Sequence, residues 1–228
     1  MKNTDVLILT FIGLLSLVGC CDKKVEDRYA MRSSHFVQTY IVPNDFILDT
    51  LAGLDNLVRI RFRGEQISML HSTDKSRFDS LAKSFNDTSY TKTVIPNSTQ
   101  AITEALVSAK VVCDKDYNLT HPSESDLGDM ILILATSPYD FIQSNYDEAL
   151  THYSYSKLWI DMMLDQRFGY KPIELLLKEV SAETMQMLYP TAYLYFKERP
   201  AKAGRYSFSV SLQLADGQEI KHDTQLIF

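Results

Sequence analysis

The clearest pattern in the chain is an alternation of apolar and polar residues at its C-terminal end. Successive side chains of a strand point to opposite faces, so this alternation predicts two strands that each bury one face. The apolar positions are Tyr206, Phe208, Val210, Leu212 and Leu214 in the first strand, and Ile220, Thr224, Leu226 and Phe228 in the second. A three-residue loop at 215–217 pairs Leu212 with Ile220 and so places the two apolar faces on the same side of the hairpin. Gly217 would then take the left-handed conformation that glycine accepts without steric cost.

A second alternation covers residues 57–63 and divides them between two faces. Val58, Ile60 and Phe62 point one way, and Arg59, Arg61 and Arg63 point the other. Gly64 and Glu65 then predict a turn into another strand at 66–70. The interpretation is a β-hairpin with one solvated face.

Other segments complete a mainly β pattern. Phe78, Leu81, Ala82 and Phe85 recur at helical spacing, which predicts a short amphipathic helix at 72–86 with Ser72 or Thr73 as N-cap. Strands are expected at 35–42, at 101–113 and at 130–135, where the continuous apolar run indicates burial on both faces. Residues 191–197 are expected to form a third strand beside the two C-terminal ones.

The segment 137–189 carries repeated helix signals. Ser137 followed by Pro138 is typical of a helix start, and Trp159 and Met162 recur at helical spacing. Pro172 opens another segment with Ile173, Leu176, Leu177 and Val180 on one face. Helices are favoured here, although residues 158–164 also fit a strand. The predicted fold is therefore α+β and mainly β: an antiparallel sandwich-like (Ig-like or jelly-roll-like) body with a helical insertion, in a single domain at 35–228.

The N-terminal residues 1–19 are typical of a signal peptide. The apolar run at 6–18 is shorter than the roughly 20 residues that a membrane-spanning helix needs. Leu17, Val18 and Gly19 lead into Cys20, and this sequence resembles the lipobox of bacterial lipoproteins. The resemblance implies removal of residues 1–19, lipid on Cys20 and a polar tether at 20–34. A plain secretory signal or a short uncleaved anchor are the alternatives.

With residues 109–118 and 204–217, this lipobox also resembles uncharacterised cell-envelope lipoproteins of Bacteroides-type bacteria. The resemblance implies a β-rich module that is held in the cell envelope by its N-terminal lipid. We expect the outer membrane, with the periplasmic and the surface face both open. Asp49-Thr50-Leu51 and Asp79-Ser80-Leu81 are similar to the short O-glycosylation acceptor of such envelopes, which makes Thr50 and Ser80 candidate modification sites.

Composition and charge narrow the function classes. The net charge of −6 argues against a general nucleic-acid surface. The three cysteines show neither metal spacing nor a disulfide framework, and Cys113 is expected to be a buried small hydrophobe. We therefore expect no cofactor and no structural metal.

Candidate chemistry is sparse. The five histidines lack metal-ligand spacing, and no serine-nucleophile motif is present. Asp114, Asp116 and Asn118 are similar to the start of a calcium loop, but Leu119 stands where that loop needs glycine. The tyrosines around 137–189 could form a sugar-stacking platform or simply part of the core.

The arginine row at 59, 61 and 63 is the candidate binding site. Its planar side chains suit carboxylates, although such a row often meets acidic residues on a neighbouring strand. The expected function is a non-catalytic binding or structural module for a protein or glycan partner. The alternative is an envelope glycan hydrolase that uses a carboxylate pair.

Overall fold

The computed structural model describes residues 31–228 except for 72, 95–98, 152 and 163. The predicted signal peptide, Cys20 and the tether up to residue 30 therefore lie outside the described residues. The fold is mainly β, with 42% strand and 14% helix. No helix within the described part is long and apolar enough to cross a bilayer.

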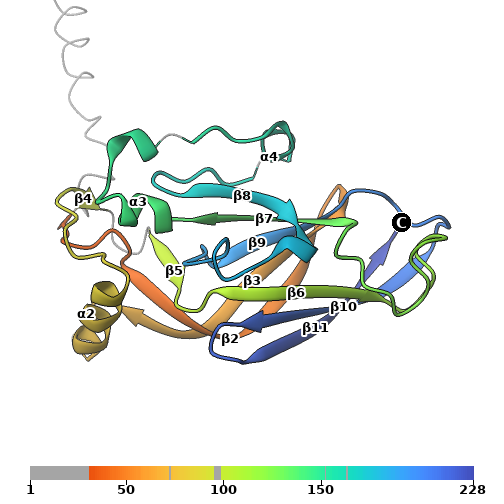
Figure 1. Ribbon diagram of the computed structural model, residues 1–228, viewed down its shortest axis with the longest axis horizontal. Helices are drawn as coiled ribbons and strands as arrows, with labels where there is room; N and C mark the ends of the chain where they lie inside the picture. Colours follow the sequence, from red (N-terminus) through yellow and green to blue (C-terminus); the bar gives the residue numbers. More distant parts are fainter. Residues whose placement is uncertain (1–30, 72, 95–98, 152, 163) are drawn as a thin grey trace, which may run out of the picture.

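Six strands form the larger sheet, in the order β5-β2-β3-β9-β7-β8 (Figure 1). Their bounds are Gln100–Ile102 (β5), Thr39–Leu51 (β2), Leu54–Ser68 (β3), Thr191–Phe196 (β9), Ile131–Ser137 (β7) and Lys171–Leu176 (β8). β5 runs parallel to β2, and all other neighbours are antiparallel. The sheet is thus mixed, whereas an antiparallel one was predicted.

A smaller antiparallel sheet has the order β11-β10-β6. Its strands are Glu219–Ile227 (β11), Arg205–Leu214 (β10) and Leu106–Cys113 (β6). The predicted C-terminal hairpin is confirmed: Leu212 pairs with Ile220, and Gly217 has a φ of 92°. The predicted strand at 101–113 is divided into β5 and β6. A further pair, β1 (Met31–Arg32) with β4 (Thr93–Val94), lies outside both sheets.

The third strand beside the C-terminal hairpin is β6, and the prediction that residues 191–197 would take this place is wrong. These residues do form a strand, β9, but it lies between β3 and β7 in the larger sheet. An alternating pattern defines which face of a strand is buried and leaves its neighbour open. The neighbour is decided by tertiary packing.

The main apolar core draws side chains from both sheets. Val210 and Leu212 of β10 and Ile60 and Phe62 of β3 belong to it, and each is at most 4% exposed. In Figure 1 the smaller sheet lies along the lower side of the molecule, beneath β3 and β9. Cys113 is buried in this core at 1% exposure, as predicted.

β2 and β3 form one long hairpin, and the predicted turn at Gly64-Glu65 is wrong. β3 runs straight through these residues, with Gly64 paired to Pro43. A Cβ on Gly64 would lie 1.8 Å from the carbonyl oxygen of Val42, so glycine is required for close approach of the two strands and not for a turn. The opposite strand carries an extra residue, Asn44, in a β-bulge at this point.

The predicted helical insertion at 137–189 is largely wrong. Its helical parts are short: α3 (Tyr139–Gln143), η2 (Glu148–Leu150), α4 (Lys157–Asp161) and η3 (Leu177–Glu179). The helix predicted after Pro172 is instead β8, followed by one turn of 3-10 helix. Ile173 and Leu177 still reach the main core, because the chain changes direction between them. α4 covers the other face of the larger sheet, where Trp159 is 2% exposed against Leu57 and Leu134.

The helix predicted at 72–86 is confirmed as α2, Lys75–Ser84. The expected N-cap of Ser72 or Thr73 is wrong, because Asp74 holds the N-cap position, without a side-chain capping hydrogen bond. Phe78 and Ala82 are buried in a second cluster with Tyr40 of β2 and Ile67 of β3. This cluster lies at the end of the molecule where Figure 1 shows α2, α3 and β4.

Candidate functional site

The candidate site is a cleft beside the second half of β3, beyond the point where β9 begins with Thr191 opposite Arg61. The N–H of Phe62 donates to the carbonyl of Pro190 at 2.9 Å, which is the last bond between the two segments. The chain around residue 188 turns instead toward β5, where Leu188 accepts a bond from Ile102 at 2.8 Å. The opening has a volume of about 460 Å³. Its lining residues are Ile41, Arg61, Phe62, Arg63, Gly64, Gln66, Gln100, Tyr189, Pro190 and Thr191.

The predicted arginine row faces away from the core, as the alternation required. Arg59 and Arg61 both bind the Oδ2 atom of Asp49 on β2, at 3.3 and 2.6 Å. The hydrogen bond from Arg61 holds the pKa of Asp49 below its usual range. For these two arginines the neighbouring strand supplies the acid.

Arg63 differs from the other two members of the row. Its cross-strand neighbour is Asp45, whose Oδ1 lies 2.5 Å from Nε2 of His222 on β11. That hydrogen bond lowers the pKa of Asp45, with a smaller Coulombic contribution from Arg63. Arg63 is exposed and has no hydrogen bond or ion pair within the described ranges. Arg63 also lines the cleft, with its hydrogen-bond donors unused by any described residue.

Neutral polar groups share the cleft with Arg61 and Arg63. Gln66 is exposed, and Gln100 and Tyr189 are half-buried, so their polar atoms are within reach of a ligand. Amides and hydroxyls bind sugar hydroxyls, and a guanidinium binds a carboxylate through two parallel bonds. The lining therefore suits an anionic ligand with several hydroxyl groups.

A further arginine, Arg167, stacks on the cleft residue Tyr189, and no pattern in the sequence indicated it. The guanidinium of Arg167 lies 3.6 Å from the ring centroid of Tyr189 and binds Asp165 at 2.5 Å. Its Nε atom is buried and has no partner in the described structure. Arg167 follows an irregular segment without periodicity, so its stacking on Tyr189 arises only from the tertiary fold.

The other predicted residues lie apart from the cleft. Thr50 is exposed near the end of β2, and Ser80 is exposed on α2. The side chains of Asp114, Asp116 and Asn118 each accept a hydrogen bond from a different backbone N–H: from Ser207 on β10, from Ser123 and from Thr120 respectively. Among the described residues no three His, Cys, Asp or Glu side chains are placed to hold a metal ion.

Tyr146 and Tyr155, two of the tyrosines of 137–189, are packed into apolar clusters. Tyr146 is 8% exposed and donates to the carboxylate of Asp87 at 2.8 Å. Tyr155 accepts a bond from the N–H of Arg167 and stacks obliquely against Trp159. These rings belong to the apolar clusters, which was the alternative interpretation.

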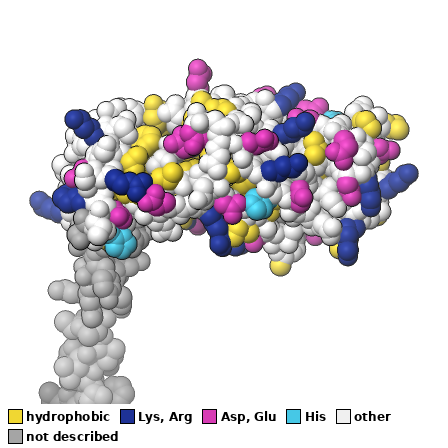
Figure 2. Space-filling model, turned by 90° about the horizontal axis from the view of Figure 1, so that it is seen from below, with side chains coloured by type: hydrophobic (Ala, Val, Ile, Leu, Met, Phe, Trp, Pro, Cys, Tyr) yellow, Lys and Arg dark blue, Asp and Glu magenta, His cyan; other side chains and the backbone are white. Residues whose placement is uncertain are grey.

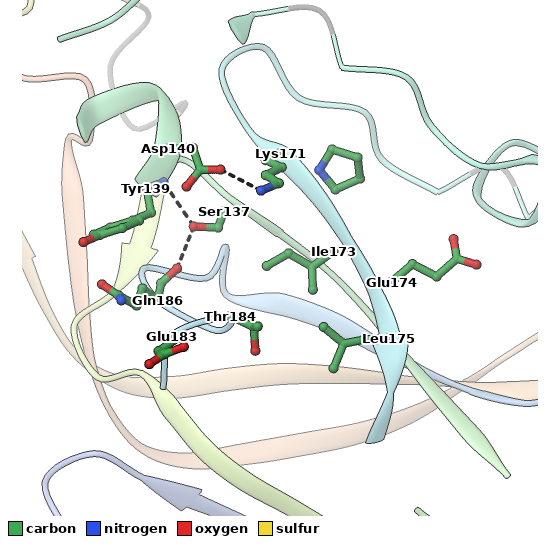
Figure 3. Close-up of a pocket in the computed structure, with 11 residues that line it drawn as sticks. Ser137, Tyr139, Asp140, Lys171, Ile173, Glu174, Leu175, Glu183, Thr184 and Gln186 are labelled. Carbon is green, nitrogen blue, oxygen red and sulfur yellow. Dashed lines mark hydrogen bonds and ion pairs between the residues drawn. The ribbon is translucent and has the colours of Figure 1, made fainter. Parts of the chain in front are cut away.

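A second pocket of about 280 Å³ lies beside β8, and three acidic residues line it: Asp140, Glu174 and Glu183 (Figure 3). Asp140 is bound to Lys171 at 2.7 Å. The hydroxyl of Ser137 donates to the carbonyl of Gln186 at 2.6 Å and accepts from the N–H of Tyr139. None of the described lining residues is a histidine, so Ser137 has no neighbouring imidazole base here.

The face seen in Figure 2 carries no large area of one charge. Lysine and arginine are interspersed there with aspartate and glutamate, and hydrophobic side chains form patches between them. Comparison with protein families, with curated protein sequences and with solved structures gives no match for this chain. Any function must therefore be argued from the geometry of the chain itself.

Proposed function

We propose that the chain is a lipid-anchored cell-envelope lipoprotein, and that its β-rich body is a non-catalytic module that binds an acidic glycan. The proposed location in the cell envelope rests on the lipobox-like sequence that ends at Cys20 and on the resemblance to Bacteroides-type envelope lipoproteins. An Ig-like or jelly-roll arrangement of the two sheets stays a prediction.

The observation that carries the binding role is that Arg63 lines the cleft and makes no hydrogen bond or close ion pair within the described residues. A guanidinium has five N–H donors in a planar fork, which matches the two oxygens of a uronic acid. Arg61 and Gln66 also line this cleft, so a ligand that fills it could meet a charge and an amide together. The volume of the cleft falls in the range of about 300–1,000 Å³ that is usual for small-ligand sites.

The binding test uses the full chain and tetragalacturonate, with the methyl-esterified tetramer as the uncharged control. Calorimetry should show saturable binding of the acid form only. Arg63→Ala should weaken it about tenfold or more, since hydrogen bonds to charged groups contribute about 1.5–3 kcal/mol. Arg205→Ala removes an arginine of β10 that is also exposed, and should leave the affinity unchanged. Equal binding by the wild type and Arg63→Ala would show that the cleft is not the site.

The proposed lipid anchor is tested separately from glycan binding. Expressed in a bacterium that acylates lipoproteins, the wild type should fractionate with membranes, and mass spectrometry should find lipid on Cys20. Cys20→Ser should abolish this acylation, and Cys21→Ser should retain it. A wild-type protein that keeps residues 1–19, or has an unmodified Cys20, would contradict the proposal.

A further inference from the structure

β8 is the last strand of the larger sheet, and half of its backbone groups face away from β7. The N–H of Lys197 donates to the carbonyl of Met130 at 3.0 Å. Because bonded pairs alternate along an antiparallel pair, the even-numbered residues of β7 direct their backbone N–H and C=O groups toward β9. The odd-numbered residues of β7 therefore face β8, where Ala135 pairs with Ile173. In β8, residues 171, 173 and 175 bond β7, and residues 172, 174 and 176 face outward.

Two observations at the ends of β8 agree with this alternation. Pro172 has no N–H, and because this residue faces outward, no hydrogen bond to β7 is lost. The outward N–H of Leu176 donates to the side chain of Glu179 at 3.2 Å. Three groups remain between these ends: the carbonyl of Pro172 and both the N–H and the carbonyl of Glu174. None of the three has a hydrogen-bond partner in the part of the chain that the structure describes.

The pocket of about 280 Å³ is lined by residues 171–175 of β8, which include the two residues that carry these three groups. Ile173 and Leu175 of β8 and Thr184 of the segment after η3 lie in its middle in Figure 3. Ser137 and Gln186 form the opposite side and are tied to each other. A strand added to β8 would place alternate side chains over this apolar centre.

The charges around the pocket are unbalanced. Lys171 is neutralised by Asp140, as the dashed line in Figure 3 shows. Glu183 is exposed and has no described partner, and Glu174 accepts a bond only from the hydroxyl of Ser156. The pocket residues therefore carry a net formal charge of −2, from three acids and one lysine.

We propose that the β8 edge binds a short extended segment of a partner protein, with a lysine or arginine directed into the pocket. The partner's backbone would bond Pro172 and Glu174 by strand addition. The aliphatic stem of its basic side chain would cover Ile173 and Leu175, and its charge would meet Glu183. A second copy of the chain fits less well, because two β8 edges would bring Glu174 and Glu183 against the same acids.

The test uses the full chain and a fluorescent peptide, acetyl-Thr-Val-Lys-Val-Thr-amide, with the lysine replaced by glutamate as the control. Anisotropy should show saturable binding of the lysine peptide and at least about fivefold weaker binding of the glutamate peptide, as one net hydrogen bond or charge pair is worth about 1 kcal/mol. No binding of the lysine peptide, or equal binding of the two peptides, would overturn the proposal.

Two variants of Glu174 separate strand addition from simple charge attraction. Glu174→Pro removes the outward N–H and leaves the bonds to β7 intact, as Pro172 does two residues earlier. Glu174→Gln removes the charge and keeps the N–H. Glu174→Pro should lose at least about fivefold more affinity than Glu174→Gln.

Glu183→Lys, on an exposed residue outside the strand, should also lose binding, and it keeps the test open if Glu174→Pro does not fold. Wild-type affinity in both Glu174→Pro and Glu183→Lys would overturn the proposal. Sedimentation that finds a dimer, lost in Glu174→Pro, would assign the edge to a second copy instead of a basic peptide. Because this edge is separate from the arginine-lined cleft, its failure would leave the glycan proposal untouched.

Discussion

The hydroxyl of Tyr146 lies 2.8 Å from Oδ1 of Asp87, although the two residues are 59 positions apart in the sequence. Asp87 is 0% exposed. The same carboxylate accepts bonds from the N–H groups of Phe36 and Val37, at 2.7 and 2.8 Å, and from the hydroxyl of Tyr40 at 3.3 Å. One acidic side chain thus fastens the segment before β2 to the end of α2 and to the loop after α3.

Replacement of this carboxylate by an amide should be costly. Each oxygen of Asp87 accepts from one backbone N–H, so in Asp87→Asn the amide NH₂ would face a donor. We expect a loss of about 2–4 kcal/mol in the free energy of unfolding, measured by urea denaturation. Tyr146→Phe removes one of the four donors and should cost only about 1 kcal/mol. Equal losses in the two variants would argue against this role of the backbone donors.

The pH dependence of stability should report on the burial of Asp87. Burial raises the pKa of this carboxyl, and the bonds from Phe36, Tyr146 and Val37 oppose the shift only in part. The folded protein therefore holds the proton to higher pH than the unfolded chain, whose carboxyl ionises near pH 4 (about 3.9). The contribution of the group is complete below that value and is lost as the pH rises through the raised pKa. The excess stability of the wild type over Asp87→Asn should therefore decrease as the pH rises through this window. An increase with pH would show that the hydrogen bonds to Asp87 outweigh its burial.

Gly64 and Gly53 offer a matched pair of substitutions in one hairpin. Gly64→Ala would drive a Cβ to 1.8 Å from the carbonyl oxygen of Val42, so we expect a loss of about 3 kcal/mol or more. Gly53 has a φ of 79° and nothing within 4 Å of a built Cβ, so Gly53→Ala should cost only the backbone strain of about 1–2 kcal/mol. Thermal melts of both variants check this order. Because Gly64 lines the cleft, its variant should also bind tetragalacturonate more weakly.

Asp49 restrains two of the three arginines in the row. Asp49→Asn should release Arg59 and Arg61 and raise the affinity for tetragalacturonate, most strongly at low ionic strength, because screening weakens exposed charges. The free energy of unfolding should change by less than about 1 kcal/mol, as is usual for exposed ion pairs.

The control is Asp55→Asn, which breaks the exposed pair with Arg199 and makes the same change in net charge. It should leave the affinity near that of the wild type. A gain of equal size in both variants would indicate a general effect of net charge and not an effect at the cleft.

The sequence correctly predicted the elements whose structure depends on residues close together along the chain. The register of the β10–β11 hairpin followed from its two apolar faces, and His222 lies opposite Val210 as that register requires. The outward direction of Arg59, Arg61 and Arg63 followed from the same period of two. Local periodicity was sufficient in each case.

Periodicity was misleading where the chain changes direction. Ile173, Leu177 and Val180 have helical spacing, but they reach the core from the strand β8 and from the 3-10 turn that follows it. The cleft could not be predicted either, because it depends on where β9 begins beside β3. The stack of Arg167 on Tyr189 joins two irregular segments, and no pattern in either one indicates it.

β3 contributes side chains to all three apolar clusters: Phe62 to the main core, Ile67 to the cluster under α2, and Leu57 to the one beneath α4. No cluster can dissolve without disturbing the strand that the other two share. The body should consequently melt in a single cooperative step that every spectroscopic probe reports at the same temperature, and proteolysis below that temperature should release no stable half.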